Sequence, residues 1–493
     1  MKFLLRKSTW ILLAIILLGI FFRSYNFANS FVFEHDQDLY SWIAKDIVVN
    51  HHLRLIGQVT SIDGFFIGPL FYYLVALLYL ITSLNPLSVV MISVGIGVLT
   101  IFSVYCLFKT FFNQSTAIIG ALLTSVSLGI VMYDRWIVPT VPSILWSVWL
   151  LYLSLALLNK KLKALPLFGL LVGLVWHIHI ALLPLVFLPL IAYLLSGDRT
   201  LFNLKKSWPL VVVSLAIFFI ISSPFWLFEL KHEFGQTKSV LTGSQTEVGE
   251  VAGVDRFFKI TGFISKNLVY DFIYPVLGKN IPAPTIYGVF LILWIFIDKK
   301  KILSRKYSFV LMAWLILVIA FHFLTKRNLS EYYLTNTAVV FLCLLSLFLS
   351  WMYQHLKILT IVFLVIYTGF NLWSFTRNSD SETSFAQKQA LVDYIQADAT
   401  SRSFPCVHIN YIADFGTNVG FRFLFWKDNL HLINTTPDVP SYDIVIPWQV
   451  SEKEVNTHFG RFGVIKPKGE YTISEATCTD SKNQLLPLLG YND

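Results

Sequence analysis

Three acidic residues occur within five positions shortly after the N-terminal apolar run, at Glu34, Asp36 and Asp38. Their neighbours are mostly apolar or aromatic, and the residues from Asp38 to Asn50 have the spacing of an interfacial helix. A carboxylate beside apolar surface has a raised proton affinity, so one of these acids could act as a general base. The alternatives are a solvated acidic loop, stabilisation of a helix N-terminus by its acids, and binding of a divalent cation.

Cationic and imidazole side chains recur farther along the chain, next to apolar runs. Arg135 could bind phosphate oxygens, or it could pair with the acid before it at a helix end. His177 and His179 lie two residues apart in an apolar stretch, where histidine is either a satisfied interior residue or a functional one. Lys326 and Arg327 form a second basic patch, which could instead anchor the chain at lipid head groups.

The composition predicts that membrane helices carry these residues. Of the 493 residues, 56% are hydrophobic and only 14% are charged, whereas about a quarter of the residues in a soluble domain are charged. These values exclude a disordered chain, a small secreted disulfide scaffold and an ordinary cytosolic enzyme. The net charge of +9 is typical of basic cytoplasmic loops. Without a basic patch interleaved with aromatic residues, it does not indicate nucleic-acid binding.

Apolar runs of about one bilayer thickness follow one another along the chain. The first ends at Phe22 without a small-residue cleavage site, and so predicts an uncleaved signal anchor. The run at 166–195 is long enough for a hairpin of two crossings that turns near His177 to Pro184. The remaining runs lie at roughly 66–84, 86–108, 115–132, 137–158, 208–228, 283–298, 307–324, 333–352 and 357–375.

The basic loops predict the orientation of these runs. Cytoplasmic loops are enriched in Lys and Arg, so we place the loops at 160–163, 199–206, 299–306 and 355–357 inside. Parity then requires that one upstream run does not cross. We expect this to be 66–84, which opens with Gly68-Pro69 and would be re-entrant or interfacial. The result is about eleven crossings, with external segments at 23–65, 229–282 and 376–493.

The predicted fold class is mostly α, a polytopic membrane helical bundle followed by a small extracytoplasmic α/β domain. We expect a transmembrane domain over 1–376 and a soluble domain over 377–493, in a multi-pass protein of the plasma membrane. In the tail, Gln387 to Gln396 has the spacing of an amphipathic helix, and 406–409 and 442–446 have that of short strands. A glycine-rich nucleotide-binding motif is absent from the sequence.

The four cysteines do not have the spacing of metal ligands. Cys106 and Cys343 lie in apolar runs, where we expect them to pack in the core. Cys406 and Cys478 lie in the tail that parity places outside, where a disulfide can form. The alternative for this pair is two buried free thiols.

The stretch Glu34 to Tyr40 resembles the acidic first-loop motif of membrane glycosyltransferases with the GT-C fold. The resemblance is to the branch of dolichyl-phosphate-mannose protein mannosyltransferases and aminoarabinose transferases, in which an Asp is followed four residues later by Tyr, as Asp36 is by Tyr40. Residues 57–73 are similar to the Pro-Leu-Tyr-Tyr segment of that branch, and Arg135 precedes two prolines as its arginine does.

Two later motifs extend the resemblance over about residues 1–375. His177-Ile178-His179 is similar to the family's Gln-x-His turn, with His177 where Gln is commoner. Tyr332-Tyr333-Leu334 is similar to its Tyr-Leu-Pro motif, with a threonine where proline is usual.

The resemblance implies an inverting transferase that moves a hexosyl or pentosyl group from a polyprenyl-phosphate carrier to a lipid, glycan or protein acceptor at the outer face of the membrane. It implies Asp36 as the base, with Glu34 and Asp38 as neighbouring catalytic acids. The residues expected to bind the donor phosphate or substrate are Tyr40, Arg135, His177, His179, Lys326, Arg327, Tyr332 and Tyr333. Membrane lipids are further expected partners. No cofactor is expected, and dependence on a divalent cation is left open.

Two other classes of protein fit parts of the sequence. A transporter or flippase for a lipid or sugar would have internal repeats and charged residues near the bilayer midplane. A membrane-anchored receptor would use its tail to bind a ligand. The clustering of the acids in one surface loop favours the transferase.

Overall fold

The computed structural model describes residues 7–60, 62, 64–198, 204–242, 251–273, 281–325, 329–414, 418–436, 438–446 and 454–485. The chain forms two compact units. The first unit comprises Met1–Ser24, Arg54–Phe71 and Met91–Thr376, and the second comprises Tyr25–Leu53, Tyr72–Val90 and Arg377–Asp493. The second unit therefore combines the predicted acidic loop with the C-terminal tail, which are far apart in the sequence.

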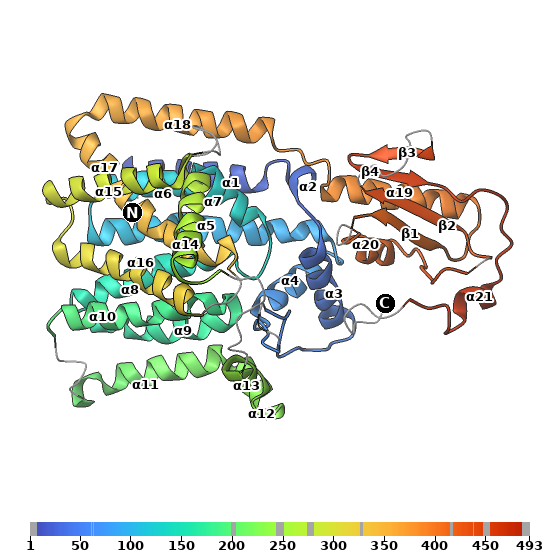
Figure 1. Ribbon diagram of the computed structural model, residues 1–493, viewed down its shortest axis with the longest axis horizontal. Coiled ribbons are helices and arrows are strands. Elements are labelled where there is room, and N and C mark those ends of the chain that lie inside the picture. The colour runs from blue at the N-terminus through green and yellow to red at the C-terminus, as the bar shows by residue number, and fades with distance from the viewer. Residues whose placement is uncertain are drawn as a thin grey trace, which may run out of the picture. The chain divides into compact units, whose positions relative to one another are not determined.

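Helices make up the first unit, and most of the long ones lie side by side in a bundle (Figure 1). A π-helical turn at Val269–Ile273 and 3₁₀ turns at Leu162–Ala164, Ile180–Phe187 and Glu331–Thr337 interrupt the α-helices. The α-helices are α1 Lys7–Ser24, α5 Val90–Phe111, α6 Gln114–Val126, α7 Leu128–Arg135, α8 Ser143–Leu158, α9 Leu165–Ile178, α10 Leu188–Leu195, α11 Leu204–Ile221, α12 Ser223–Lys231, α13 Gly235–Thr242, α14 Gly253–Leu268, α15 Ala283–Lys299, α16 Arg305–Thr325, α17 Ala338–His355 and α18 Lys357–Arg377.

Four helices of the described residues are long and apolar enough to cross a membrane: Pro86–Phe111, Arg305–Thr325, Glu331–His355 and Lys357–Arg377. The number is six if α6 with α7, bent by 56°, and α11 with α12, bent by 61°, each form one span. Five shorter apolar helices accompany them. The mostly helical membrane fold is as predicted, whereas the count of about eleven crossings stays a prediction.

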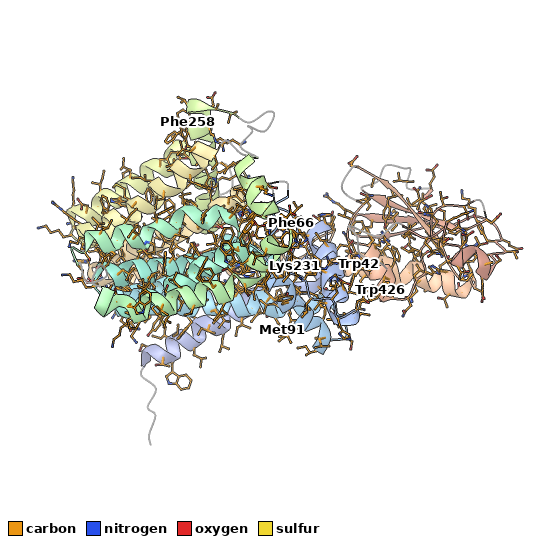
Figure 2. The ribbon with its side chains drawn as sticks, turned by 90° about the horizontal axis from the view of Figure 1, so that it is seen from below. Trp42, Phe66, Met91, Lys231, Phe258 and Trp426 are labelled. Atoms are coloured by element: carbon orange, nitrogen blue, oxygen red, sulfur yellow. A yellow bond between two sulfur atoms is a disulfide. The ribbon has the colours of Figure 1, made fainter. Side chains whose placement is uncertain are left out.

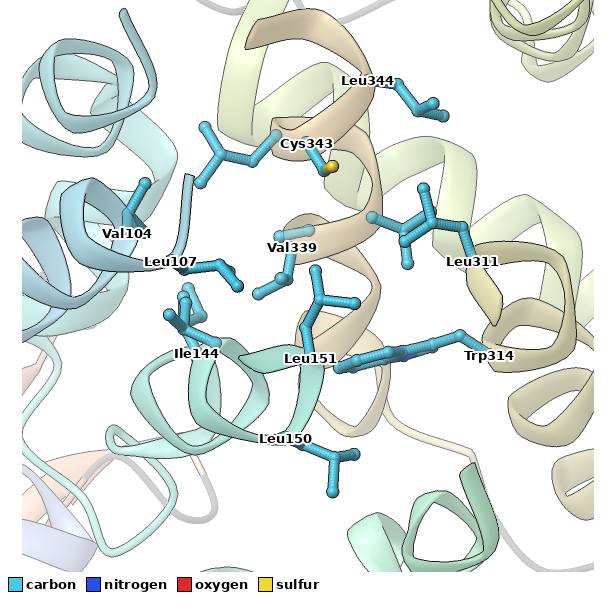
Figure 3. Packing of buried hydrophobic residues seen from close by; sticks show 14 of the residues in the cluster. Val104, Leu107, Ile144, Leu150, Leu151, Leu311, Trp314, Val339, Cys343 and Leu344 are labelled. Carbon is cyan, nitrogen blue, oxygen red and sulfur yellow. The ribbon is translucent and has the colours of Figure 1, made fainter. Parts of the chain in front are cut away.

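The core of the first unit lies where α5, α8, α16 and α17 meet (Figure 3). Val104, Leu151, Trp314 and Val339 are buried in it, one from each of these helices. The one polar atom of Trp314 is satisfied, because its Nε1 donates to the Asn336 side-chain oxygen at 3.0 Å. A helix that buries apolar side chains on this scale packs against other helices on that face and leaves the opposite face for lipid.

The predicted hairpin at 166–195 consists of α9, the 3₁₀ turn at Ile180–Phe187, and α10. Lys160 precedes this stretch and Ser196 follows it, and both line one cavity at the same end of the first unit. Lys300, in the turn after α15, lines the same cavity. The predicted orientation of the helices requires these basic turns to lie at one end of the first unit. Which side of the membrane this end faces stays a prediction.

The second unit contains a four-stranded sheet with the order β1-β2-β4-β3. Strands β1 (His408–Ala413) and β2 (Ser441–Ile446) are parallel, whereas β4 (Phe462–Ile465) pairs antiparallel with β2 and with β3 (Thr457–Phe459). Its helices are α2 Phe27–Ser30, α3 His35–Val49, most of α4 Leu70–Ile81, α19 Phe385–Ser401, α20 Arg422–Lys427 and α21 Glu475–Thr479. The small α/β fold predicted for the tail is confirmed, although the β-prone residues 471–473 have no regular structure.

Helix α4 has 12 residues, and at 1.5 Å per residue it is about 18 Å long. This is too short for a hydrocarbon core of about 30 Å. In its second half, the buried Tyr79 hydroxyl lies 2.7 Å from Ser41 Oγ, and its ring stacks on Phe423 within the second unit. These contacts support the expectation that the run at 66–84 does not cross the membrane.

The disulfide left open by the sequence is present between Cys406 and Cys478, whose α-carbons are 5.8 Å apart. Both cysteines are buried with Ile433 and Val439 in a small apolar cluster. Cys343 is free and buried, and Cys106 is free and half-buried, as expected for cysteines in apolar runs. The bridge joins residues 72 positions apart and therefore closes a long loop of the tail.

Titration of the denatured, unreduced protein with a thiol reagent should find two free cysteines per chain. Replacing both bridged cysteines by serine should lower the free energy of unfolding of the second unit by about 2–4 kcal/mol, because the open chain regains loop entropy. The double variant of Cys106 and Cys343 to serine is the control, and it should leave no titratable thiol. Four titratable thiols in the native sequence would contradict the bridge.

Candidate functional site

The acidic residues of the second unit lie at the start of α3. Glu34 is the N-cap of this helix, where its carboxylate accepts from the Gln37 backbone and its own N–H donates to Gln37 Oε1 at 3.1 Å. This reciprocal arrangement satisfies two backbone donors that a helix N-terminus leaves open. Glu34 therefore has a structural function in this position, and Asp36 follows it in the first turn, half-buried.

Asp38 has a different setting, although it lies only two residues farther along α3. It is 5% exposed, and its Oδ1 accepts from the Phe423 backbone N–H at 3.2 Å in the first turn of α20. Burial raises the pKa of Asp38 to about 6, since a carboxylate loses hydration there. Tyr40 is 1% exposed inside the same unit. Among the three acids, Asp36 is the one for which we keep the role of base.

The tail holds α3 in place through aromatic packing and one buried lysine. Trp42 contacts Phe423 and Trp426 of α20, each with ring centres 5.6 Å apart, and Lys45 Nζ lies 4.8 Å from the Trp426 ring centre (Figure 2). A cation above an indole face is attracted by its quadrupole. The helix that carries Asp36 is thus packed directly against the tail.

Lys388 of α19 fixes the chain just before this helix. Its Nζ donates to the carbonyl oxygens of Phe33 at 2.6 Å and Val419 at 2.8 Å. Lys388 is 2% exposed, and burial lowers its pKa to about 8. The Phe385 backbone N–H also donates to Phe31 O at 2.7 Å. These bonds give the residues around the acidic turn one position relative to the tail.

In the first unit, the predicted cation Arg135 lies beside a buried ion pair. Its neighbour Asp134 pairs with Arg23 of α1, with Oδ2 at 2.6 Å from Nη2 and 2.8 Å from Nε. Arg23 is fully buried, and its remaining N–H groups donate to the carbonyl oxygens of Gly19, Thr124 and Ser125. Thr124 and Ser125 belong to the last turn of α6, whose carbonyls a helix cannot satisfy by itself.

This ion pair explains why α6 and α7 bend by 56° without a proline at the break. The guanidinium of Arg23 replaces the helical donors at the bend, and Asp134 of α7 balances its charge. Gly97 of α5 leaves space for the Arg23 side chain, because a Cβ at this position would overlap it. Arg135 follows Asp134, is 6% exposed, and donates from Nη1 to Phe22 O at 3.0 Å.

His177 has the setting of a satisfied interior histidine. Its Nε2 lies 2.8 Å from Ile221 O, and its Nδ1 accepts from the Leu70 N–H at 3.4 Å. Both ring nitrogens are therefore bonded to the backbone, which fixes a neutral tautomer with the proton on Nε2. Of the two readings that the sequence left open for His177, these contacts favour the structural one.

His179, by contrast, is brought together with both predicted tyrosines. Its ring stacks on Tyr333 with centres 4.5 Å apart, and Tyr332 meets it edge-on at 6.0 Å. His322 lies parallel to the Tyr333 ring at 6.3 Å, so that Tyr333 is between two imidazoles. Nε2 of His322 is buried without a hydrogen-bond partner among the described residues. The sequence did not single out His322.

Tyr332 also lines a cavity of about 490 Å³, whose surface is mostly apolar but includes the charged residues Lys266, Asp271 and Glu331. Tyr133 and Trp136 of the α7 region form one wall, and the segment from Lys266 to Asp271 forms the other. Lys266 Nζ pairs with Glu331 Oε2 at 2.5 Å at the rim. The backbone of the π-turn packs directly on Gly129 of α7, where a Cβ would come within 2.6 Å of it. Arg135 is not among the residues that line this cavity.

An apolar groove of about 270 Å³ shares the same segment. Leu268, Phe272 and Ile273 line the groove, whereas Lys266, Asn267, Val269, Tyr270 and Asp271 line the cavity of about 490 Å³. Val289 of α15 and Phe363 of α18, both exposed, form part of the opposite wall. One short segment therefore separates a cavity that holds charged side chains from a groove that is open at the apolar surface of the first unit.

Two of the predicted substrate-binding residues, Lys326 and Arg327, lie outside the described residues. The described part of the chain holds no group of three His, Cys, Asp or Glu side chains that could bind a metal ion. The residues that sequence reasoning missed are Arg23, Lys266, His322 and Lys388. Arg23 ends the first apolar run, where a charge resembles an ordinary flank, and Lys388 has the spacing of a surface lysine on α19.

Comparison with known proteins supports the resemblance drawn from the motifs. Residues 67–228 match the family described as dolichyl-phosphate-mannose-protein mannosyltransferase. No curated protein matches the chain. The structure is similar to ArnT from Cupriavidus metallidurans in the apo state, with a TM-score of 0.62 and 11% sequence identity over 92% of this chain and 97% of ArnT.

Further solved structures are similar. ArnT from the same organism bound to undecaprenyl phosphate has a TM-score of 0.58 and 11% identity, over 93% of this chain and 98% of ArnT. The Archaeoglobus fulgidus oligosaccharyltransferase in complex with Zn and sulfate has a TM-score of 0.45 and 15% identity, over 90% of this chain and 68% of that one. The chain has the fold of ArnT, and its apolar helices are those of a multi-pass membrane protein. The resemblance to the GT-C membrane glycosyltransferases is confirmed.

Substitution of Asp134 by Asn should leave the Arg23 guanidinium buried without its counter-charge. Removal of one partner from a buried ion pair typically costs about 3–5 kcal/mol, so the thermal unfolding midpoint in detergent should fall sharply. The double variant Arg23→Met with Asp134→Leu removes both charges and should recover much of the loss. The exposed pair of Arg461 and Glu382 is the matched control, and Glu382→Gln should have little effect. Equal effects at both sites would contradict the assigned role.

Proposed function

We propose that this chain, with the fold of ArnT, is an inverting glycosyltransferase that uses a polyprenyl-phosphate-linked sugar at the outer face of the plasma membrane. The observation that carries the proposal is that a cavity with charged and hydroxyl-bearing residues in its wall and a wholly hydrophobic groove share one segment of the first unit. A lipid-linked sugar needs both environments, since its phosphate and sugar are polar and its carrier is a hydrocarbon chain. ArnT has been crystallised with undecaprenyl phosphate, which is a carrier of this class.

For the donor, we propose that the sugar and phosphate occupy the cavity lined by Lys266 and Tyr332 and that the first isoprene units occupy the groove. Lys266 at the cavity rim provides a cation, and Tyr133 and Tyr332 provide hydroxyl groups. A phosphate becomes a good leaving group when fixed charges and donors stabilise its developing negative charge. The family motif implies that Arg135, together with Lys326 or Arg327, assists this step; Arg135 does not line the cavity, so it would act there only from behind the wall.

For the base, we propose Asp36. Inversion at the sugar carbon is a single displacement, in which the acceptor hydroxyl attacks from the face opposite the phosphate. The hydroxyl is a weak nucleophile until a base removes its proton. Asp36 lies in the first turn of a helix whose cap and packing are fixed by Glu34, Lys388 and Trp42. Such fixed positioning is what a general base needs.

For the acceptor, we propose the cavity of about 520 Å³ in the second unit. His35 and Asp38 of α3 line it together with His408, Phe421 and Arg422 of the tail. These side chains offer both donors and acceptors for a hydroxyl-bearing ligand beside an aromatic wall. Because α3 carries both this wall and Asp36, an acceptor bound there would be held by the helix that supplies the base. The nature of the acceptor, whether lipid, glycan or protein, decides how much of this cavity it fills.

Asp36→Asn should lower transfer by about 10²–10⁴-fold, the usual loss when a general base is removed. The measurement follows radiolabel from polyprenyl-phosphate-linked hexose and pentose to membrane acceptors, with the wild-type protein in parallel. Asp393→Asn, an exposed acid of α19 in the same unit, is the matched control and should keep wild-type transfer. If the Asp36 variant is inserted, folded and as active as the control, Asp36 is not the base.

Lys266→Gln should weaken the binding of undecaprenyl phosphate by about 10–150-fold, because a hydrogen bond to a charged group contributes about 1.5–3 kcal/mol. Direct titration of the purified protein with undecaprenyl phosphate gives the dissociation constant without knowledge of the sugar. Lys231→Gln, an exposed lysine of α12 (Figure 2), removes the same charge and should not change the affinity. An unchanged dissociation constant for the Lys266 variant would exclude this cavity as the phosphate site.

A further inference from the structure

A polar cavity of about 970 Å³ lies at the end of the first unit that holds Lys160, Lys300 and Lys306. Its walls come from the turns after α5, α8 and α15 and from the ends of α10 and α17. The described residues that line it include Lys160, Lys300 and Lys306 and no acidic residue. Its volume is in the usual range of ligand sites. It shares no lining residue with the cavity and groove proposed for the donor.

Hydrogen bonds fix the neutral polar groups of this wall. The Asn159 side-chain amide donates to the Tyr307 hydroxyl at 2.7 Å and to Leu155 O at 2.6 Å. Asn113 Oδ1 caps α6 by accepting from the Thr116 N–H at 2.9 Å, and it also accepts from the Ser350 hydroxyl at 3.2 Å. The wall therefore has a fixed shape without a ligand, which lowers the entropic cost of binding.

Two helices end at this cavity with the same turn. After α8, Lys161 N donates to Ala156 O and Lys160 N to Leu157 O, both at 2.9 Å, with Lys160 at φ 62°. After α15, Ile302 N donates to Ile297 O and Lys301 N to Asp298 O, with Lys301 at φ 52°. Both are Schellman motifs, in which the residue of positive φ is usually glycine.

A lysine in that position is less favourable than glycine, because its Cβ crowds the backbone. A cation near a helix C-terminus is stabilised by the helix dipole. In α15, Lys299 in the last turn already places a cation there, and its φ is not positive. The dipole alone therefore does not account for the lysine at the strained position of the first turn, where Lys160 lines the cavity; Lys301, at the strained position of the second turn, does not line it. Backbone strain that persists where a less strained residue exists indicates a functional constraint.

We propose that this cavity is a binding site for a phosphate group, with Lys160, Lys300 and Lys306 as its cations. The phosphate would come from the head group of an anionic phospholipid or from a soluble phosphate compound. Trp351 and Tyr307 form an aromatic rim, and Lys300 Nζ lies 5.8 Å from the Trp351 ring centre. Aromatic and basic residues at one level are typical of the lipid head-group region. The proposal is independent of the transferase activity.

The test measures lipid binding to the purified full-length protein. Native mass spectrometry counts the phosphatidylglycerol and phosphatidylcholine retained, and the thermal midpoint is followed as each lipid is added. The wild-type protein should prefer phosphatidylglycerol, and Lys300→Gln with Lys306→Gln should lower that affinity by about 10–30-fold, from the usual contribution of a lysine at an anionic surface. Lys109→Gln with Lys357→Gln removes the same charge from exposed lysines that do not line the cavity.

The two double variants separate a built site from general positive charge. If the Lys109 and Lys357 variant keeps wild-type affinity while the cavity variant loses it, the site stands. Equal losses in both variants, or no preference for phosphatidylglycerol over phosphatidylcholine together with no effect of inorganic phosphate, would overturn the proposal. If inorganic phosphate raises the midpoint and displaces the lipid, the ligand is a soluble phosphate compound.

Lys160→Gly tests the strained turn separately. Glycine should relieve the positive φ, so the midpoint of the lipid-free protein should rise or stay unchanged. Retention of phosphatidylglycerol should nevertheless fall, because one of the three cations is lost. A gain in stability with unchanged retention of phosphatidylglycerol would show that Lys160 is outside the phosphate site. The assignment of the site would then depend on the Lys300→Gln with Lys306→Gln variant.

Discussion

A guanidinium buried among apolar helices is tolerable only if every N–H and its charge are satisfied, and the first unit is arranged around that requirement at Arg23. Asp134 balances the charge, and backbone carbonyls from α1 and the end of α6 take up the remaining donors. The bend between α6 and α7 exists because Arg23 replaces the donors lost there. The bend in turn sets the course of α7, and α7 forms one wall of the cavity lined by Lys266 and Tyr332.

The two units place the proposed chemistry in different physical environments. The acidic helix α3 is held by a sheet-containing tail through aromatic packing and the hydrogen bonds of Lys388. Contacts of this kind also stabilise soluble domains. The cavity and groove proposed for the donor are built from apolar helices and one π-turn. A transferase that joins a lipid-linked sugar to a polar acceptor needs both environments, because neither water nor hydrocarbon alone dissolves the two substrates.

Local patterns in the sequence were sufficient for much of this structure. Helical spacing located α3 and α19, and the external placement of the tail made the bridge between Cys406 and Cys478 an open possibility that the structure confirms. The spacing could not assign separate roles to the three acids. N-capping by Glu34 depends on backbone atoms, and Asp38 is buried against a partner 385 residues away. Asp134, the partner of Arg23, is likewise 111 residues distant. The periodicity of helices and strands reveals only contacts between residues that are close in the sequence.

The bond between Lys388 and Phe33 spans 355 positions of the chain, and this sets an order of assembly during synthesis. At about 5–20 residues per second, roughly 20 to 70 s pass between the emergence of the acidic helix and that of its anchor. Throughout this interval the aromatic face of α3 has no tail to cover it. Any chain that ends before α19 retains Glu34, Asp36 and Asp38 yet cannot fix the helix that carries them. The N-terminal loop therefore cannot function until the tail has been synthesised and has packed against α3.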